Sequence, residues 1–206
     1  LYIITDPEVS IDIMIDRANL ALQTIKGNYV NRFAYYDEAL REILMEEQEI
    51  VNEMEDALQS GQFKMYLQPK CDLKDGTIVG AEALARWAHP KKGLIAPGKF
   101  IPIFEKNGFI MSLDQFIWEE ACKLLKKWID EGNSVLPISV NISRVNLFNP
   151  QLANIIKNLA EKYGIPPRLL ELEITESAYT NNAYLLIDLI HDLHENGFTV
   201  LMDDFG

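Results

Sequence analysis

The chain has 206 residues, 48% of them hydrophobic and 24% charged, which is the composition of a soluble globular protein able to bury a sizeable core. Acidic residues outnumber basic ones by 31 to 19, and the net charge of −12 argues against a DNA or RNA backbone as partner. There is no signal-peptide pattern and no apolar run of membrane-spanning length. Cys71 and Cys122 lack metal-site spacing, so we interpret them as reduced structural thiols of a cytoplasmic protein.

The first 37 residues predict a strand at Leu1–Ile4, a helix over 11–25 capped by Ser10, and a returning strand over 31–36. So few elements cannot make an independent core. We therefore interpret residues 1–37 as the tail of a domain. The chain opens inside an apolar run and closes directly after a strand pattern, so we expect it to be a piece of a longer protein.

Residues 38–60 are rich in Glu and carry one stripe of apolar residues, which predicts a helix. We interpret this segment as an amphipathic linker helix lying on the next domain. A short dimeric coiled coil is the alternative, but its apolar seam is brief and is interrupted by Glu47.

Residues 61–206 form the third region, in which strand and helix patterns alternate. Strands are predicted at 64–71, 78–87, 137–142, 170–175 and 199–203, and helices at 112–131, 149–163 and 183–196, with a loop over 89–98. Ser112 is the expected cap of the first helix, and Gly164 ends the second. This alternation favours an α/β fold with a parallel sheet, and a (β/α) barrel is its leading form.

The strand at 78–87 carries a carboxylate, Glu82, and a guanidinium, Arg86, within an apolar run. Alternation along the strand points Glu82, Leu84 and Arg86 to one side. Opposite charges on the inner face of a buried strand are costly unless something binds them. A cation for the acid and a phosphate for the arginine would do so.

Each later strand also carries an oxygen ligand near its carboxyl end. They are Asn141, Glu173, and the adjacent pair Asp203 and Asp204. In a (β/α) barrel such positions converge on the face where active sites form. Carboxylates and an amide, without Cys or clustered His, suit Mg²⁺ or Mn²⁺, and adjacent aspartates suggest two ions.

Simpler interpretations stand beside these. Glu82 and Glu173 could be structural acids paired with Arg86 or with backbone, and Glu171 could pair within the barrel floor. His191 and His194 are three apart on a helix and could mimic a metal pair, although a solvated helix face is the better interpretation. His89-Pro90 is read as a turn, and the nearby lysines as a solvated loop that could also attract an anion.

Six motifs occur in the order found in EAL-domain cyclic-di-GMP phosphodiesterases, which the chain resembles over about residues 57–206. They are Tyr66-Leu67-Gln68-Pro69, Glu82-Ala83-Leu84-Ala85-Arg86-Trp87, Phe100-Ile101-Pro102, Val140-Asn141-Ile142-Ser143, Glu171-Leu172-Glu173-Ile174-Thr175-Glu176 and Asp203-Asp204-Phe205-Gly206. Residues 1–37, which contain Asp16-Arg17-Ala18-Asn19-Leu20-Ala21, resemble the end of a GGDEF domain. The GGDEF signature itself is absent from the chain.

The resemblance implies a TIM-like barrel whose first strand is antiparallel, with about five of eight strands in this chain. It implies hydrolysis of cyclic-di-GMP to linear pGpG by two-metal activation of water. The implied ligands of the first ion are Glu82, Asn141, Glu173 and Asp203, of which Glu82, Glu173 and Asp203 are the catalytic carboxylates. Asp203 would bridge to a second ion held also by Asp204.

The resemblance also implies roles around the metal site. Arg86 would hold a phosphate oxygen, and Gln68 and Leu84 would contact the nucleotide. Glu176 would brace a regulatory loop that couples metal binding to dimerisation, so a homodimer is expected. Sensory or GGDEF regions would lie upstream in a parent protein, which could be membrane-anchored through them.

Two other functions remain open. The family pattern continues beyond residue 206 with a lysine near the attacking water and a glutamate on the second metal. If these are replaced in the parent protein, it is a non-catalytic cyclic-di-GMP receptor. The third possibility is that the chain alone is an inactive fragment.

Overall fold

The computed structural model describes residues 1–26, 32–175 and 183–203. The chain divides into two units, Leu1–Glu53 and Met54–Gly206, and the boundary falls within helix α2 (Glu38–Gln59). Helix α2 confirms the helix that was predicted over 38–60. The assignment of residues 1–37 to a domain remnant stays a prediction.

In the first unit, α1 (Ile11–Gln23) begins where the sequence predicts. The Ser10 side chain accepts a hydrogen bond from the Ile13 N–H at 3.4 Å, which satisfies one of the free donors of the first turn. The guanidinium of Arg17 lies 5.3 Å from the ring centre of Tyr2 and 5.4 Å from that of Tyr36. These cation–π contacts tie α1 to the segments before and after it.

The two strands predicted in the first unit are wrong for the described residues. Neither Leu1–Ile4 nor 32–36 is a strand, and Asn31 lies outside the described part. The segments are joined by the Leu1 amino group, which donates to Ala34 O at 2.6 Å, and by the Tyr36 N–H, which donates to Leu1 O at 2.7 Å. Two bonds that share one residue do not build a ladder, which needs successive pairs along both segments.

The second unit is built on one sheet. Its strands are β1 (Phe63–Cys71), β2 (Ile78–His89), β3 (Gly93–Ile95), β4 (Ile138–Asn141), β5 (Leu170–Thr175) and β6 (Thr199–Asp203). The order is β1-β2-β4-β5-β6, with β3 paired to β2. β1 is antiparallel to β2, and β2, β4, β5 and β6 are mutually parallel. The predicted antiparallel first strand and incomplete barrel are confirmed.

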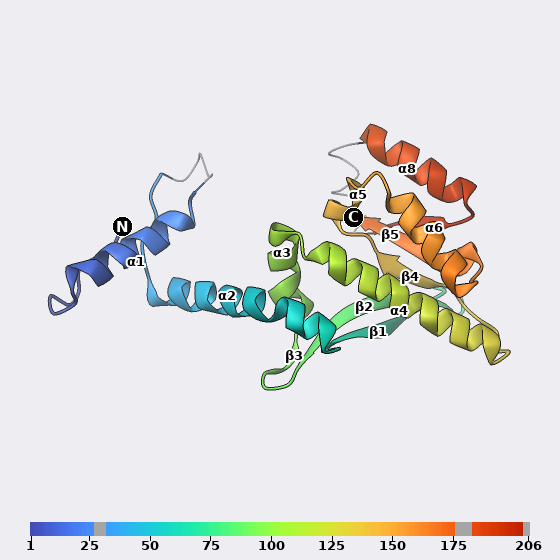
Figure 1. Cartoon of the computed structure of the whole chain (residues 1–206), viewed down its shortest axis with the longest axis horizontal. Helices are drawn as coiled ribbons and strands as arrows, with labels where there is room; N and C mark the ends of the chain where they lie inside the picture. Colours follow the sequence, from blue (N-terminus) through green and yellow to red (C-terminus); the bar gives the residue numbers. More distant parts are fainter. Residues whose placement is uncertain (27–31, 176–182, 204–206) are drawn as a thin grey trace. The chain divides into compact units, whose positions relative to one another are not determined.

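Helices pack on the sheet and on one another (Figure 1). They are α3 (Pro97–Asn107), α4 (Ile110–Asp130), α5 (Arg144–Leu147), α6 (Leu152–Tyr163) and α8 (Ala183–Glu195), with a 3₁₀ turn at Pro167–Leu169. α4 contacts β1, β2 and β4, while α8 contacts β6 and α6. The core between these layers includes Trp118, Ile138, Val140 and Leu172, all with no exposed surface.

Some elements and boundaries differ from the predictions. The segment predicted as a loop contains β3 and leads into α3, which the sequence reading missed. α4 begins at Ile110, so Ser112 lies inside the helix and does not cap it. The short helix α5 was also missed, whereas Gly164 ends α6 with a φ of 61°, as expected for a C-cap glycine.

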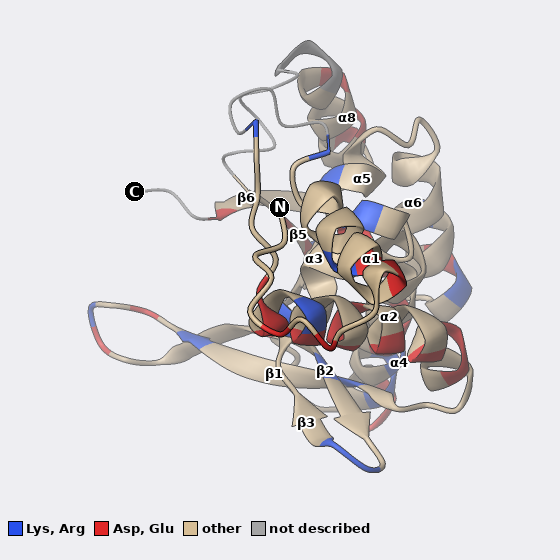
Figure 2. Ribbon diagram, turned by 90° about the vertical axis from the view of Figure 1, so that its left-hand side faces the viewer, with Lys and Arg blue, Asp and Glu red and all other residues tan. Residues whose placement is uncertain are grey.

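Acidic side chains are spread over the helices, and α2 carries many of them (Figure 2). No helix among the described residues is long and apolar enough to cross a membrane.

Candidate metal centre and nucleotide cleft

Strand register brings the predicted site residues onto one face of the sheet. Glu82 on β2 stands opposite Ser139 on β4, which in turn stands opposite Glu171 on β5. Asn141 and Glu173 form the next row, two residues further along each strand. Because partners in register point to the same face, these polar side chains line one surface. The opposite face, which includes the buried Ala83, packs in the core.

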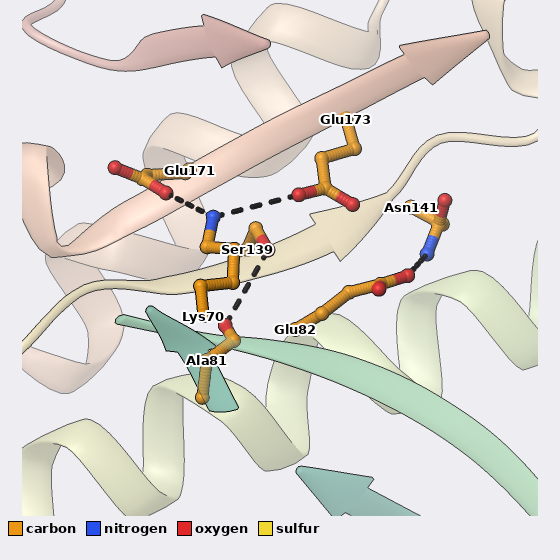
Figure 3. A network of polar contacts seen from close by, with 7 residues as sticks. All are labelled: Lys70, Ala81, Glu82, Ser139, Asn141, Glu171 and Glu173. Carbon is orange, nitrogen blue, oxygen red and sulfur yellow. Dashed lines mark hydrogen bonds and ion pairs between the residues drawn. The ribbon is translucent and has the colours of Figure 1, made fainter. Parts of the chain in front are cut away.

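Three carboxylates converge on this surface. One oxygen each of Glu82, Glu173 and Asp203 lies within 4.8 Å of the others. Asn141 Nδ2 donates a hydrogen bond to Glu82 Oε1 at 2.9 Å, so the fourth predicted ligand borders the same space (Figure 3). Glu82 lies in the middle of the long strand β2, and its pairing with Ser139 is the second of the three pairs that join β2 to β4.

A lysine that the sequence reading overlooked lies beside this cluster. Lys70 on β1 places its Nζ 2.7 Å from Glu171 Oε2 and 3.5 Å from Glu173 Oε1 (Figure 3). The other Glu173 oxygen points toward Glu82 and Asn141 in the same view. Lys70 therefore contacts one oxygen of Glu173 and leaves the second oxygen facing the carboxylate cluster.

The surroundings of Glu173 oppose its ionisation. Burial raises the pKa of its carboxyl, and the charges of Glu82 and Asp203 raise it further. The Ser139 hydroxyl and the Lys70 ammonium act in the opposite direction and lower that pKa. Three carboxylates this close repel one another, and a cation among them removes the repulsion.

The donor set fits a hard divalent cation. Carboxylate oxygens are the preferred ligands of Mg²⁺ and Mn²⁺, and Asn141 can supply a fourth oxygen. Its amide nitrogen now faces Glu82, and a half-turn of the amide puts Oδ1 in the same place. The residues present can therefore hold a metal ion without rebuilding the strands.

A cleft of about 550 Å³ adjoins the cluster. Glu82, Leu84, Arg86 and Asn141 line it, as do apolar side chains of α3 and α4. The guanidinium of Arg86 donates to Ala85 O at 2.9 Å and lies 5.9 Å from the centre of the Tyr66 ring. Leu84 and Arg86 are thus in the cleft wall, where a bound ligand could contact them.

The remaining predicted residues are less completely placed. Gln68 is exposed on β1 opposite Glu82, and it is not among the described lining residues of the cleft. Asp204 and Glu176 lie outside the described residues, so the second metal ligand and the regulatory loop stay predictions.

The structure also tests the simpler, structural interpretations of Glu171, Arg86 and His89. Glu171 does pair inside the sheet, with Lys70, as one alternative held. In the described part of the chain, Arg86 contacts Ala85 and Tyr66 instead of pairing with Glu82. His89 forms a turn, where its Nδ1 accepts from the N–H groups of the two following lysines, at 3.1 and 3.0 Å.

The helical histidines do not form a pair of metal ligands. His191 lies instead near Asp192 and Glu195, in an exposed group on α8 whose ligand atoms are within 4.8 Å of one another. His191 Nδ1 is 3.8 Å from Glu195 Oε1. Exposed groups of this kind are common on solvated helix faces.

Two further polar residues near the cleft escaped the sequence reading. Asp114 on α4 lines the cleft and is 8% exposed, and Lys70 supplies the cation of the network. One signal was available for Lys70. Two inward acids on the strand at 170–175 require a nearby cation, and Lys70 lies two residues after Gln68, on the same face of its strand.

Comparison with known proteins places this geometry in a family. The family model of the EAL domain matches residues 51–206, which is more than half of the chain. MucR of Pseudomonas aeruginosa, described as a bifunctional diguanylate cyclase/cyclic di-GMP phosphodiesterase, is 30% identical over 201 residues, which are 98% of this chain and 29% of MucR. NbdA of the same organism, a cyclic di-GMP phosphodiesterase, is 33% identical over 193 residues, 94% of this chain and 25% of NbdA. The chain thus spans less than a third of these relatives.

Solved structures of EAL proteins are similar in fold to this chain. The PaMucR phosphodiesterase in complex with c-di-GMP has a TM-score of 0.74 and 33% identity, over 77% of this chain and 64% of that one. The EAL enzyme Bd1971 bound to cAMP and cyclic-di-GMP has a TM-score of 0.70 and 27% identity, over 98% and 52%. The matched region contains the four converging side chains and the cleft beside them, and the chain belongs to the EAL domain family.

Proposed function

We propose that the protein hydrolyses one phosphodiester bond of cyclic-di-GMP and releases linear pGpG. The observation that carries the proposal is the convergence of Glu82, Glu173 and Asp203, from three neighbouring strands, beside a cleft lined by Arg86. EAL phosphodiesterases depend on divalent metal ions, and the relatives MucR and NbdA are named as phosphodiesterases of this nucleotide.

The metal ions in this proposal are Mg²⁺ or Mn²⁺, and there are two. Glu82, Asn141, Glu173 and Asp203 hold the first, and Asp203 and Asp204 contribute to the second. Bound ions of this kind lower the pKa of a water molecule and neutralise the phosphate under attack.

The chain's own side chains orient the substrate. Arg86 holds a phosphate oxygen through its guanidinium, which matches the geometry of a phosphate. Leu84, in the cleft wall, and Gln68, on the neighbouring strand, contact the nucleotide. Lys70 contacts one oxygen of Glu173, so the other oxygen would be available to a metal ion bound among the carboxylates.

The proposal extends to the surroundings of the domain. Residues 1–37 are the end of a GGDEF domain, and sensory regions lie upstream of it in a longer protein. Support comes from MucR, which is named for both activities and aligns with 98% of this chain. The protein acts as a homodimer, and Glu176 links the metal site to the dimer contact.

The test is the variant Glu82→Ala, assayed with cyclic-di-GMP and Mn²⁺ and with nucleotides separated by chromatography. Loss of a ligand should reduce turnover by more than the roughly 10–100-fold that removal of a ligand's supporting partner costs. The melting temperature should stay close to that of the unaltered chain, because Glu82 is half-buried and lines the cleft, and is not part of the hydrophobic core.

Glu195→Ala is the matched control, because it removes a carboxylate from the exposed group on α8. It should leave hydrolysis unchanged. Undiminished turnover in Glu82→Ala, or equal loss in both variants, would contradict the site. Nucleotide binding without any hydrolysis would favour the receptor function.

A further inference from the structure

Helix α4 contacts the chain around the metal ligand Asn141 at two points. Asp114 and Trp118 are four residues apart, so both lie on one face of the helix, the face that meets β4 and α5. Trp118 has no exposed surface and Asp114 is 8% exposed. Two polar groups are therefore buried on the helix face that packs behind the proposed site.

Trp118 binds Asn141 itself. Its indole Nε1–H donates a hydrogen bond to the Asn141 carbonyl oxygen at 3.0 Å. β4 pairs with β2 only as far as Val140, so this carbonyl lies just beyond the β2–β4 ladder. The indole supplies the partner that the ladder no longer provides, and buried carbonyls need one.

Asp114 binds the chain two residues further on. Its Oδ2 accepts from the Ser143 N–H at 3.0 Å and from Asn146 Nδ2 at 2.8 Å. Ser143 immediately precedes α5, so one carboxylate joins the end of the strand's loop to the start of that helix. A buried carboxylate that accepts hydrogen bonds from neighbouring groups restrains them strongly.

We propose that α4 positions the metal ligand Asn141, with Trp118 and Asp114 as the positioning residues. The inference rests on the proposed function, because it concerns the same metal site. The backbone is held at the carbonyl of Asn141 and again at Ser143. Both points follow directly after the Cα of Asn141, so they fix the backbone from which its side chain donates to Glu82 Oε1 at 2.9 Å.

Such support has a measurable consequence for metal affinity. Partners of metal ligands set the ligand's orientation, and their removal commonly costs 10–100-fold in affinity or activity. If Asn141 is not held, part of the binding free energy of the ion is used to offset the conformational entropy lost when Asn141 is ordered. A purely structural Trp118 would fill the core without this effect.

The experiment compares two variants that each remove one buried indole. Trp118→Phe removes the donor to Asn141. Trp87→Phe is the matched control, because Trp87 is also fully buried and its Nε1 donates to Gln62 Oε1, likewise at 3.0 Å. Mn²⁺ is titrated into the full chain without nucleotide, and free Mn²⁺ is followed by electron paramagnetic resonance.

Trp118→Phe should weaken Mn²⁺ binding by roughly 10-fold or more, and Trp87→Phe should leave it unchanged. Equal affinity in Trp118→Phe and the unaltered chain overturns the inference, as does an equal loss in both variants. Absence of Mn²⁺ binding by the unaltered chain overturns the proposed function and the inference together.

Asp114→Leu keeps the test decisive if Trp118→Phe does not fold. It retains a side chain of similar size and removes the acceptor for Ser143 and Asn146. It should also weaken Mn²⁺ binding. A folded Asp114→Leu chain with unaltered affinity overturns the inference.

Discussion

At the scale of single residues, Asp114 links the site to stability. Burial raises the pKa of its carboxyl from 3.8 to about 6, although Ser143 and Asn146 lower it through their hydrogen bonds. The folded chain then binds this proton more tightly than the unfolded chain does. The stability that this proton contributes is complete below about pH 4 and is lost as the pH rises through about 6.

Asp114→Asn should remove that dependence. Both hydrogen bonds end on the same carboxylate oxygen, so an amide oxygen in its place can accept them without a charge. Between pH 4 and pH 7 the unfolding free energy of the unaltered chain should fall, relative to the variant, by on the order of 2 kcal/mol. Urea midpoints at several pH values measure this, and parallel curves for the two chains would show that Asp114 does not titrate as described.

The sequence predicts that some candidate residues lie close together, because their strands are easy to recognise. Glu82, Asn141 and Glu173 follow from the alternation of side chains along buried strands, and they do meet. Lys70 was missed because its partner Glu171 is 101 positions away in sequence. The strands β2 and β4 lie between β1 and β5 in the sheet order, so the order alone does not show that the Lys70 side chain reaches Glu171.

At the scale of elements, Gly80 controls the approach of β2 to its neighbours. A Cβ at Gly80 would lie 3.0 Å from Pro137 O and 3.3 Å from Lys70 Cε. The lysine stem can move, but Pro137 O is fixed by the Ala81 N–H, which donates to it at 3.0 Å. Gly80→Ala should therefore cost about 1–3 kcal/mol of unfolding free energy, as overpacking does.

Gly98→Ala is the comparison for that measurement. Gly98 lies in α3, with nothing within 4 Å of an added Cβ, so the change should be neutral or should stabilise by up to about 1 kcal/mol. Denaturant unfolding of both variants checks this. Equal effects of the two changes would mean that the space around Gly80 is not limiting.

Helix α3 shows why some elements could not be predicted. Pro97 and Gly98 suggest a loop, and Pro102 lies inside the helix, where it ordinarily costs about 3 kcal/mol. Phe100 and Phe104, one turn apart, are fully buried against Phe63 and Trp87. That packing comes from strands distant in sequence, and it outweighs the local preference.

In the first unit the error is the reverse: strands were predicted that the structure does not contain among the described residues. Its apolar runs look like strands, yet β-structure needs a partner along its whole length. Among the described residues Leu1–Ile4 and 32–36 share only two backbone hydrogen bonds. Periodicity alone could not reveal that the ladder is missing.

At the scale of the whole molecule, the negative net charge of the protein is consistent with a site that binds cations. A protein with a net charge of −12 repels a dianionic nucleotide, and its carboxylate cluster cannot bind one unaided. Cations bound at the cluster, as proposed, would reverse the local charge next to Arg86. Nucleotide binding by this acidic protein therefore depends on where the metal ions bind.

Anomalous diffraction from crystals of the chain grown with Mn²⁺ and cyclic-di-GMP locates the metal ions. We expect a manganese peak bounded by Glu82, Asn141, Glu173 and Asp203, with metal–oxygen distances of about 2 Å. A map without a peak among these side chains, or with manganese only at His191, Asp192 and Glu195, would contradict it.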